Sequence, residues 1–257
     1  MTSRVAIVSG VGPGLGRSIA LALAGAGMNV TLAARDSERI EAVAGEVRAR
    51  GAEATTITAD ITVASDRARV VEQTVAVWGR LDVLVNNAFS MGPMAPAIEI
   101  ADDDWRAVLE VNLIGAVAMS VEAARWMAEH GGGSIVMVNS QAARRGAPRR
   151  GPYAASKAGL LAAAQVLASE LGPSGIRVNS VVPGQIWGDA LEAHYQEIAA
   201  RRGSTVDEVV SGVVRDIPLR RIPDADEIAA AVVFLAGDAA SAITGQALDV
   251  NAGNWFH

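Results

Sequence analysis

Apolar residues follow two alternating patterns along the chain. Short runs rich in β-branched residues predict buried strands, and longer Ala- and Leu-rich stretches with polar positions at helical spacing predict amphipathic helices. The predicted strands cover residues 4–9, 29–33, 54–58, 83–86, 134–139, 177–182 and 247–250. The predicted helices cover residues 15–26, 37–50, 65–78, 103–129, 153–171, 190–215 and 224–235. This alternation predicts an α/β fold in which helices cover both faces of a parallel sheet.

No linker or shift in composition divides the sequence, so we expect residues 1–257 to form one doubly wound domain with about seven strands. Glycines follow several of the predicted helices, where chain reversal favours them. The longest departure from strand–helix alternation lies at about residues 184–218. An insertion late in such a sheet is a candidate lid over a substrate site.

The composition excludes several classes of function. Apolar residues make up 51% of the 257 residues, which argues against a disordered chain. A net charge of −6 argues against a nucleic-acid surface, because such a surface needs a basic face. The sequence holds no cysteine, and its histidines at positions 130, 194 and 257 show no ligand spacing. We therefore expect neither a disulfide nor a metal site.

The Ala-rich stretch 107–128 is apolar, but Glu110, Asn112, Glu122 and Arg125 interrupt it, so we do not expect it to span a membrane. Residues 1–9 lead directly into a predicted strand, without the pattern of a signal peptide. These features predict a cytoplasmic protein without a membrane partner.

A glycine-rich turn joins the first predicted strand to the first predicted helix. Residues 9–17 read Ser-Gly-Val-Gly-Pro-Gly-Leu-Gly-Arg, with the spacing Gly10-x-x-x-Gly14-x-Gly16. Glycines let a backbone approach a pyrophosphate, and the start of a helix offers free N–H groups to it. The spacing differs from G-x-G-x-x-G, and an ordinary tight turn is the simpler alternative. Alternate glycines at the first crossover favour the phosphate site.

A serine, a tyrosine and a lysine in the second half of the chain predict a site for proton transfer. Tyr153 and Lys157 are four residues apart and share one face of a predicted helix, and Ser140 follows a predicted strand. An ordinary tyrosine has a pKa of about 10, and a nearby ammonium group lowers it. A serine beside them can hydrogen-bond the same substrate oxygen. Taken singly, each residue is also explained as a surface or strand-end residue.

The order and spacing of these motifs resemble the short-chain dehydrogenase/reductase family over essentially the whole chain. The family's T-G-x-x-x-G-x-G corresponds to residues 9–16, with serine in place of threonine, and its N-N-A-G corresponds to Asn86-Asn87-Ala88. Further matches are Asn112, the set Ser140, Tyr153 and Lys157, and the Pro183-Gly184 pair. The resemblance implies a Rossmann-type sheet, a nicotinamide cofactor and hydride transfer to or from a carbon that bears oxygen.

The resemblance also implies roles for individual residues. Tyr153 would be the general acid in reduction and the general base in oxidation, Ser140 would orient the substrate oxygen, and Asn112 would position a water in a relay to Lys157. Lys157 would lower the pKa of Tyr153 and hold the nicotinamide ribose. The expected cofactor-binding residues are Gly10, Gly14, Leu15, Gly16, Arg35, Asp60, Ile61, Asn87, Ala88, Tyr153, Lys157, Pro183, Gly184 and Ile186.

The end of the second predicted strand bears on the choice of cofactor. By resemblance, the position that discriminates between NAD and NADP falls on Ala34, and Arg35 follows it. An arginine there pairs with a 2′-phosphate, whereas a carboxylate accepts from a 2′-hydroxyl. The pattern favours NADP(H) over NAD(H). If the match to the family pattern is shifted by one residue, the carboxylate of Asp36 lies towards the ribose instead.

Two departures from the family pattern bear on the substrate. Phe89 stands where N-N-A-G has glycine, and Gly188 stands where many relatives have threonine. The expected substrate-site residues are Phe89, Met91, Gln141, Trp187, Leu191 and Tyr195, with Met94 and Ala142 as further wall candidates. Because most of these are apolar, we expect a hydrophobic alcohol or ketone.

The loop 144–150 carries four arginines, which either attract an anionic substrate or acyl carrier, or form a solvated loop or subunit contact.

The function expected from the sequence as a whole is that of an NADP(H)-dependent ketoreductase or alcohol dehydrogenase. Alternatives are a catalytically idle nucleotide-binding regulator on the same fold, a 3-oxoacyl-thioester reductase, and an epimerase or dehydratase of the extended branch. The apolar stripes of helices 107–129 and 154–171 resemble the family's dimer interface and predict a homotetramer, with a dimer as the alternative.

Overall fold

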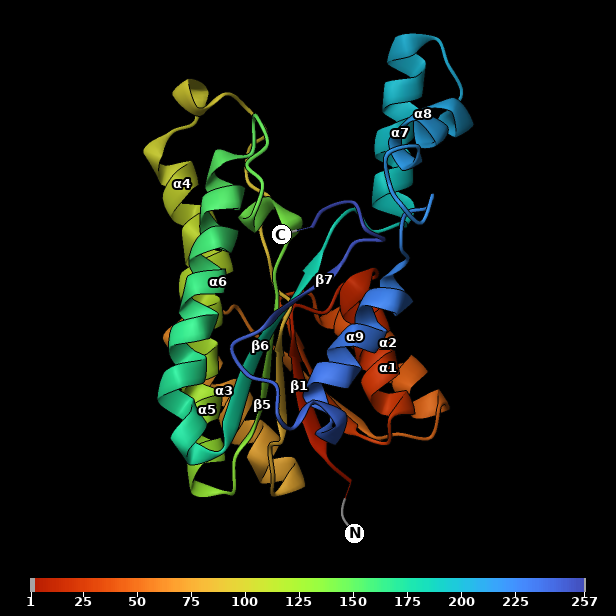
Figure 1. Ribbon diagram of the computed structural model, residues 1–257. Helices are drawn as coiled ribbons and strands as arrows, with labels where there is room; N and C mark the ends of the chain where they lie inside the picture. The colour runs from red at the N-terminus through yellow and green to blue at the C-terminus, as the bar shows by residue number, and fades with distance from the viewer. Residues whose placement is uncertain (1–2, 257) are drawn as a thin grey trace.

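A computed structural model describes residues 3–256, so His257 lies outside the described residues. The seven strands form one parallel sheet in the order β3-β2-β1-β4-β5-β6-β7 (Figure 1). The strands are β1 (Val5–Ser9), β2 (Asn29–Ala34), β3 (Ala54–Thr58), β4 (Val83–Asn86), β5 (Gly133–Val138), β6 (Ile176–Pro183) and β7 (Ala247–Val250). Each strand predicted from the sequence is confirmed to within one residue at either end, because short β-branched runs between polar turns leave little room for another assignment.

Helices cover both faces of this sheet. They are α1 (Leu15–Gly25), α2 (Ser37–Ala49), α3 (Ala64–Trp78), α4 (Asp102–Leu109), α5 (Ala116–Glu129), α6 (Gly151–Leu171), α7 (Asp189–Arg202), α8 (Val206–Val214) and α9 (Ala225–Ala236). Figure 1 shows α1, α2 and α9 on one side of the strands and α3, α5 and α6 on the other. This doubly wound arrangement in one domain is the predicted fold.

Alternation along the strands sends side chains into two separate cores. In β1, Val8 packs on the face covered by α1 and α9, and its neighbour Ile7 packs on the face covered by α5 and α6. Ile19 and Leu23 of α1 close the first core, and both side chains are fully buried. Each such side chain contributes about 1.5–3 kcal/mol to stability when it leaves water. The sheet is therefore a rigid platform from which the loops at its carboxyl edge project.

The predicted helix 103–129 is present as one continuous run, but it contains a π-helical segment, Glu110–Gly115, between α4 and α5. This run of 28 residues is long and apolar enough to cross a membrane by length and composition alone. In the fold its apolar residues pack on the sheet, where Met119, Ala123 and Met127 are buried. That packing accounts for its apolar character.

The prediction of a single helix over 190–215 is wrong, because the segment folds as α7 and α8. Gly203 ends α7 in the left-handed conformation at φ 61°, and Thr205 begins α8 with a capping box to Glu208. The pair encloses a small apolar core of its own around Tyr195, Ala199 and Val209. Figure 1 shows it projecting beyond the carboxyl ends of the strands. Its role as a lid stays a prediction.

The register of the sheet gathers the sequence motifs at one edge. Ser9 is paired with Asn86 of β4, which in turn is paired with Met137 of β5. Val138, at the end of β5, is paired with Val181 of β6. The loops that follow β1, β4, β5 and β6 therefore open onto the same space, as expected for a ligand site in a parallel sheet.

Candidate active site

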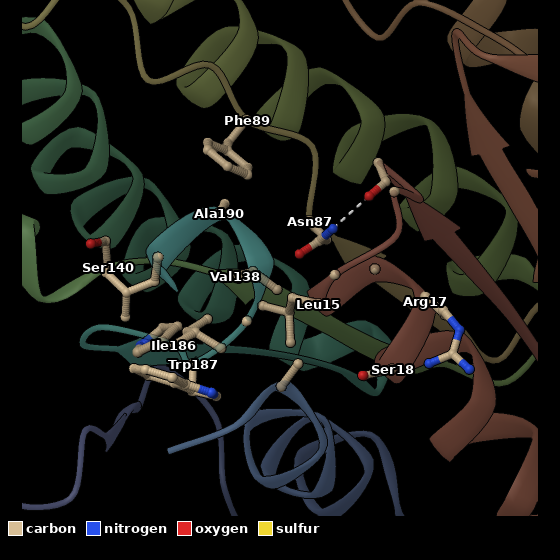
Figure 2. A pocket seen from close by; sticks show the side chains of 18 of the residues that line it. Leu15, Arg17, Ser18, Asn87, Phe89, Val138, Ser140, Ile186, Trp187 and Ala190 are labelled. Atoms are coloured by element: carbon tan, nitrogen blue, oxygen red, sulfur yellow. Dashed lines mark hydrogen bonds between the residues drawn. The ribbon is translucent and has the colours of Figure 1, made fainter. Parts of the chain in front are cut away.

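A cleft of about 760 Å³ lies at this carboxyl edge, between the glycine turn and the start of α7 (Figure 2). Of the residues predicted to form the site, fifteen line the cleft: Gly10, Gly14, Leu15, Gly16, Asn87, Phe89, Met91, Ser140, Tyr153, Lys157, Pro183, Gly184, Ile186, Trp187 and Leu191. They come from loops that are far apart in the sequence. The sheet thus assembles one site from the separate motifs.

The glycine turn is shaped to leave its backbone open to the cleft. Gly10 adopts φ 90°, and a Cβ there would lie 2.2 Å from the backbone nitrogen of Ala88, so no other residue fits. A Cβ on Gly16 would lie 2.6 Å from the carbonyl oxygen of Gly10. Around Gly12 and Gly14, by contrast, the space beside the backbone is open.

The first turn of α1 begins in this open space. No side chain caps the helix at Gly14, so its first N–H groups are available to an anion. Asn87 steadies the turn by donating from Nδ2 to the carbonyl of Gly10 at 2.5 Å (Figure 2). These features fit the pyrophosphate of a dinucleotide cofactor, which the turn and the start of α1 would hold.

The three proton-transfer residues line the same cleft. Lys157 is 2% exposed and donates from Nζ to the carbonyl of Val138 at 2.8 Å. Its ammonium lies 5.9 Å from the centre of the Tyr153 ring. Ser140 lies close enough to the Tyr153 hydroxyl to act on its pKa, a placement that suits residues handling one substrate oxygen. The predicted grouping of Ser140, Tyr153 and Lys157 is therefore present.

Burial shifts the pKa values of both residues of the pair. It raises the pKa of Tyr153, while the Ser140 side chain and the positive charge of Arg150 act to lower it. Burial also lowers the pKa of Lys157 to about 8. Removing both groups from water disfavours both charged forms, so burial opposes the lowering of the Tyr153 pKa that Lys157 is expected to cause.

Asn112 lies in the π-helical segment and is fully buried. Its Oδ1 accepts from the backbone N–H of Ser90 at 2.6 Å, and its Nδ2 donates to the Ser90 carbonyl and to Ser156 Oγ. The side chain thereby ties the loop after β4 to α6. Asn112 is not among the described residues that line the cleft, and its role in a proton relay stays a prediction.

Four predicted cofactor residues lie beside the cleft rather than in its wall. Arg35 has an 80% exposed side chain, with Nη1 4.0 Å from Asp60 Oδ2. Asp60 accepts from the backbone and hydroxyl of Thr62, which lowers the pKa of its carboxyl. Ile61 packs its side chain near Gly115, and Ala88 backs the Gly10 turn. Arg35 and Asp60 thus mark the end of β2 and β3, next to the glycine turn.

The predicted substrate residues fall into two groups by position. Phe89, Met91, Trp187 and Leu191 line the cleft. Four other candidates, Met94, Gln141, Ala142 and Tyr195, are not among the described lining residues, and their contact with a substrate stays a prediction.

Packing explains why two of these residues do not line the cleft. Tyr195 is 2% exposed, because it belongs to the core between α7 and α8, and its hydroxyl donates to Gln185 at 2.9 Å. Gln141 accepts from Asn254 Nδ2 at 3.2 Å, so its amide turns to the C-terminal segment.

The arginines of the loop 144–150 are largely occupied within the chain. Arg144 pairs with Asp249 at 3.3 Å, and both side chains are mostly buried. Arg145 lies 5.1 Å above the Trp255 ring, and Arg149 donates to the carbonyl of Met94. The loop is therefore fastened to β7 and the C-terminal segment rather than presented as a free basic patch.

Sequence reasoning missed several residues that line the cleft. They are Arg17, Ser18, Val138, Asn139, Asp189, Ala190 and the segment 224–226. The place of Arg17 in the cleft was predictable from the sequence, since it directly follows the last glycine of the turn. Its side chain pairs with Glu46 of α2. Residues 224–226 carry no such signal, because they reach the cleft through the packing of α9 against α1 and the pairing of Asp224 with Trp187.

Comparisons with known proteins agree with this site. Residues 10–254 match the family model described as enoyl-(acyl carrier protein) reductase. An uncharacterized oxidoreductase of Mycobacterium tuberculosis is 37% identical over 257 residues, which cover 100% of this chain and 94% of that protein. A 3-oxoacyl-[acyl-carrier-protein] reductase of Staphylococcus aureus is 34% identical over 255 residues, which cover 99% of each chain.

Solved structures show the same fold. A variant of actinorhodin polyketide ketoreductase with NADPH has a TM-score of 0.91 at 32% identity, covering 98% of this chain and 97% of that chain. NAD+-bound xylitol dehydrogenase has a TM-score of 0.89 at 32% identity, covering 96% and 97%. With the glycine turn and the Ser140, Tyr153 and Lys157 group in place, these matches decide the family. The chain belongs to the short-chain dehydrogenase/reductase family, whose oxidoreductases act on CH–OH groups with a nicotinamide cofactor.

Proposed function

We propose that the protein is an NADP(H)-dependent oxidoreductase that interconverts a secondary alcohol and a ketone. The observation that carries this proposal is that Ser140, Tyr153 and Lys157 line the same cleft as the glycine turn. The apolar side chains of Phe89, Met91 and Leu191 support a hydrophobic small-molecule substrate.

When bound, the nicotinamide supplies the hydride in reduction and takes it up in oxidation. In reduction, the Tyr153 hydroxyl gives its proton to the carbonyl oxygen of the substrate, and in oxidation the phenolate takes the proton back. Ser140 donates a hydrogen bond to the same oxygen and holds it within reach of Tyr153. The carbonyl of Val138 fixes the ammonium of Lys157 beside the phenol ring, where a positive charge favours the phenolate.

Replacing Tyr153 by Phe tests this mechanism. The variant lacks the only group that we assign to proton transfer with the substrate, so we expect turnover to fall by about 10²- to 10⁴-fold. Turnover is followed by NADPH absorbance with a panel of ketones, and NADPH binding is measured separately by calorimetry. Binding should stay within about twofold of the parent, since the turn that holds the pyrophosphate is unchanged.

Tyr195→Phe is the matched control, because it removes the other tyrosine hydroxyl of the chain at a position outside the cleft wall. Full activity in the Tyr153→Phe variant would sink the mechanism. If the parent protein binds NADPH but turns over no ketone or alcohol, the catalytically idle regulator is the better description.

Arg35 supports the choice of NADP(H). Its guanidinium is exposed at the end of β2, and Asp60, its nearest described carboxylate, lies at the distance limit of an ion pair. A 2′-phosphate next to it would gain a charge-assisted hydrogen bond.

We expect Arg35→Ala to weaken NADPH binding about tenfold and to leave NADH binding unchanged. Arg39→Ala, on the exposed side of α2, is the control; equal affinities for NADPH and NADH in the parent would refute the assignment.

A 3-oxoacyl-thioester reductase is the second candidate, favoured by the similarity to the Staphylococcus aureus reductase. Against it, three arginines of the loop 144–150 already have partners within the chain. Acetoacetyl-coenzyme A in the same ketone panel separates the two, because a thioester reductase would prefer it to every simple ketone.

We also propose that the protein assembles as a homotetramer. Exposed apolar residues support this, since Ile114 in the π-helical segment before α5 and Val166 in α6 are about half exposed, at 49% and 53%. Apolar surface of this kind is stabilised when a second subunit covers it.

A further inference from the structure

The cleft collects aromatic side chains in a chain that has few of them. Aromatic residues make up 4% of the sequence, yet Phe89, Tyr153 and Trp187 all line the same cleft. The second tyrosine, Tyr195, lies directly behind Trp187, with ring centres 6.2 Å apart. This concentration exceeds what a general apolar lining requires, because Leu, Val and Met would exclude water equally well.

Phe89 is exposed and yet held on a fixed backbone. Its side chain is 58% exposed, and its ring meets Tyr153 edge to face, with centres 6.5 Å apart at 69°. The chain before and after it is anchored: Asn87, two residues earlier, bonds to the Gly10 carbonyl, and the backbone N–H and carbonyl of Ser90 both bond to Asn112. A large apolar ring that is left in water on an anchored loop, next to the proton-transfer phenol, is placed to be covered by a ligand.

Trp187 is fixed in a similar way on the other side of the cleft. Its backbone N–H donates to the carbonyl of Pro223 at 2.8 Å, and Tyr195 packs behind its ring. Figure 2 shows Phe89 and Trp187 on different sides of the pocket, with Ser140 at a level between them in that view. The two rings come from the loops after β4 and β6, so each has its own support.

The rest of this part of the cleft is apolar. Met91 and Leu191 line it, and a methionine sulfur packs favourably against aromatic rings. Asp189, at the start of α7, also lines the cleft and disfavours a negative charge nearby. An uncharged ring is the group that suits all of these neighbours.

We infer that Phe89 and Trp187 form an aromatic clamp that selects ketones and alcohols carrying a flat, uncharged aromatic ring close to the reacting carbon. This inference rests on the proposed function, which supplies the reacting carbonyl, and goes beyond it by naming the substrate class. Stacking on each ring contributes about two- to tenfold in affinity beyond simple burial. The clamp therefore discriminates an aromatic ring from a saturated ring of similar size, which a merely hydrophobic wall does not.

Two matched ketones test the clamp. 4-Phenylbutan-2-one and 4-cyclohexylbutan-2-one share the carbonyl and the chain and differ in whether the ring is aromatic. Their dissociation constants are measured by calorimetry with NADP+ and again with NAD+, where no hydride is available for reduction. Their kcat/KM values are measured with the reduced cofactors. The same measurements are made on Phe89→Leu, Trp187→Leu and Phe89→Trp.

Phe256→Leu is the control for the substitution itself, since Phe256 is 74% exposed and is not among the described residues of the cleft wall. We expect the parent to favour the phenyl ketone about tenfold in both binding and kcat/KM. Phe89→Leu and Trp187→Leu should each lose most of that preference, while Phe89→Trp and Phe256→Leu keep it.

An equal or reversed preference in the parent overturns the clamp, and so does a preference that both leucine variants retain. The two proposals fail separately. If the phenyl ketone binds better and the variants remove the effect, but nothing is turned over, the clamp stands and the proposed function falls. If Tyr153-dependent turnover occurs without a preference for the aromatic ring, the proposed function stands and the clamp falls.

Discussion

Lys157 carries the largest electrostatic cost in the site. It is 2% exposed, and the Val138 carbonyl is its hydrogen-bond acceptor among the described residues. It is also the only lysine in the sequence, so any signal from a lysine side chain reports on this position alone. Burial lowers its pKa from 10.5 in water to about 8, which places its charge change close to physiological pH.

This shift predicts how stability depends on pH. Between pH 8 and 10.5 the unfolded chain binds more protons than the folded one, so the contribution of Lys157 to stability rises with pH across that window. Below it, burying the charge costs about 3 kcal/mol. Lys157→Met should therefore be more stable than the parent at pH 7, by an amount that shrinks as the pH approaches 10.

Urea unfolding of the parent and of Lys157→Met at pH 7, 8 and 9.5 measures this difference. In the parent, selective isotope labelling of lysine yields one NMR signal whose titration midpoint is expected near pH 8. A midpoint near that of a free lysine, or a stability difference that does not change with pH, would contradict the prediction.

At the scale of elements, the strands were predicted correctly and the division of 190–215 into α7 and α8 was not. A strand in a doubly wound sheet is a short apolar run between polar turns, and that signal is local. The break between α7 and α8 was local as well: Gly203 followed by Thr205 and Glu208 is a helix stop followed by a capping box, and the apolar periodicity on either side masked it. The apolar periodicity therefore continues across a boundary that the capping residues set.

The π-helical segment around Asn112, by contrast, is not encoded by the residues near it in the sequence. Its residues continue a helical pattern, and the segment keeps Asn112 buried against Ser90 and Ser156. The single sign in the sequence is an asparagine in an otherwise apolar helix, which suggests a special role without revealing the extra residue per turn. The partners that hold Asn112 come from two other elements, so the sequence near it does not encode them.

At the scale of the whole molecule, the proposed homotetramer is testable by light scattering after size-exclusion chromatography. The parent should elute as four subunits, and Val166→Arg, in the exposed side of α6, should give a smaller assembly because it buries a charge at the contact. Val77→Arg, at a 55% exposed position of α3, is the matched control. A parent protein that scatters as a monomer would defeat the proposal.

The sequence by itself determined the α/β alternation, the glycine turn and the group of Ser140, Tyr153 and Lys157, because each depends on residue types at short spacing. The reaction class follows from these. Only the tertiary structure decided that Asp189 and residues 224–226 face the glycine turn, and that Tyr195 is buried behind Trp187 instead of lining the cleft. It also decided the pKa directions of Tyr153 and Lys157, because burial is set by packing between elements far apart in the chain.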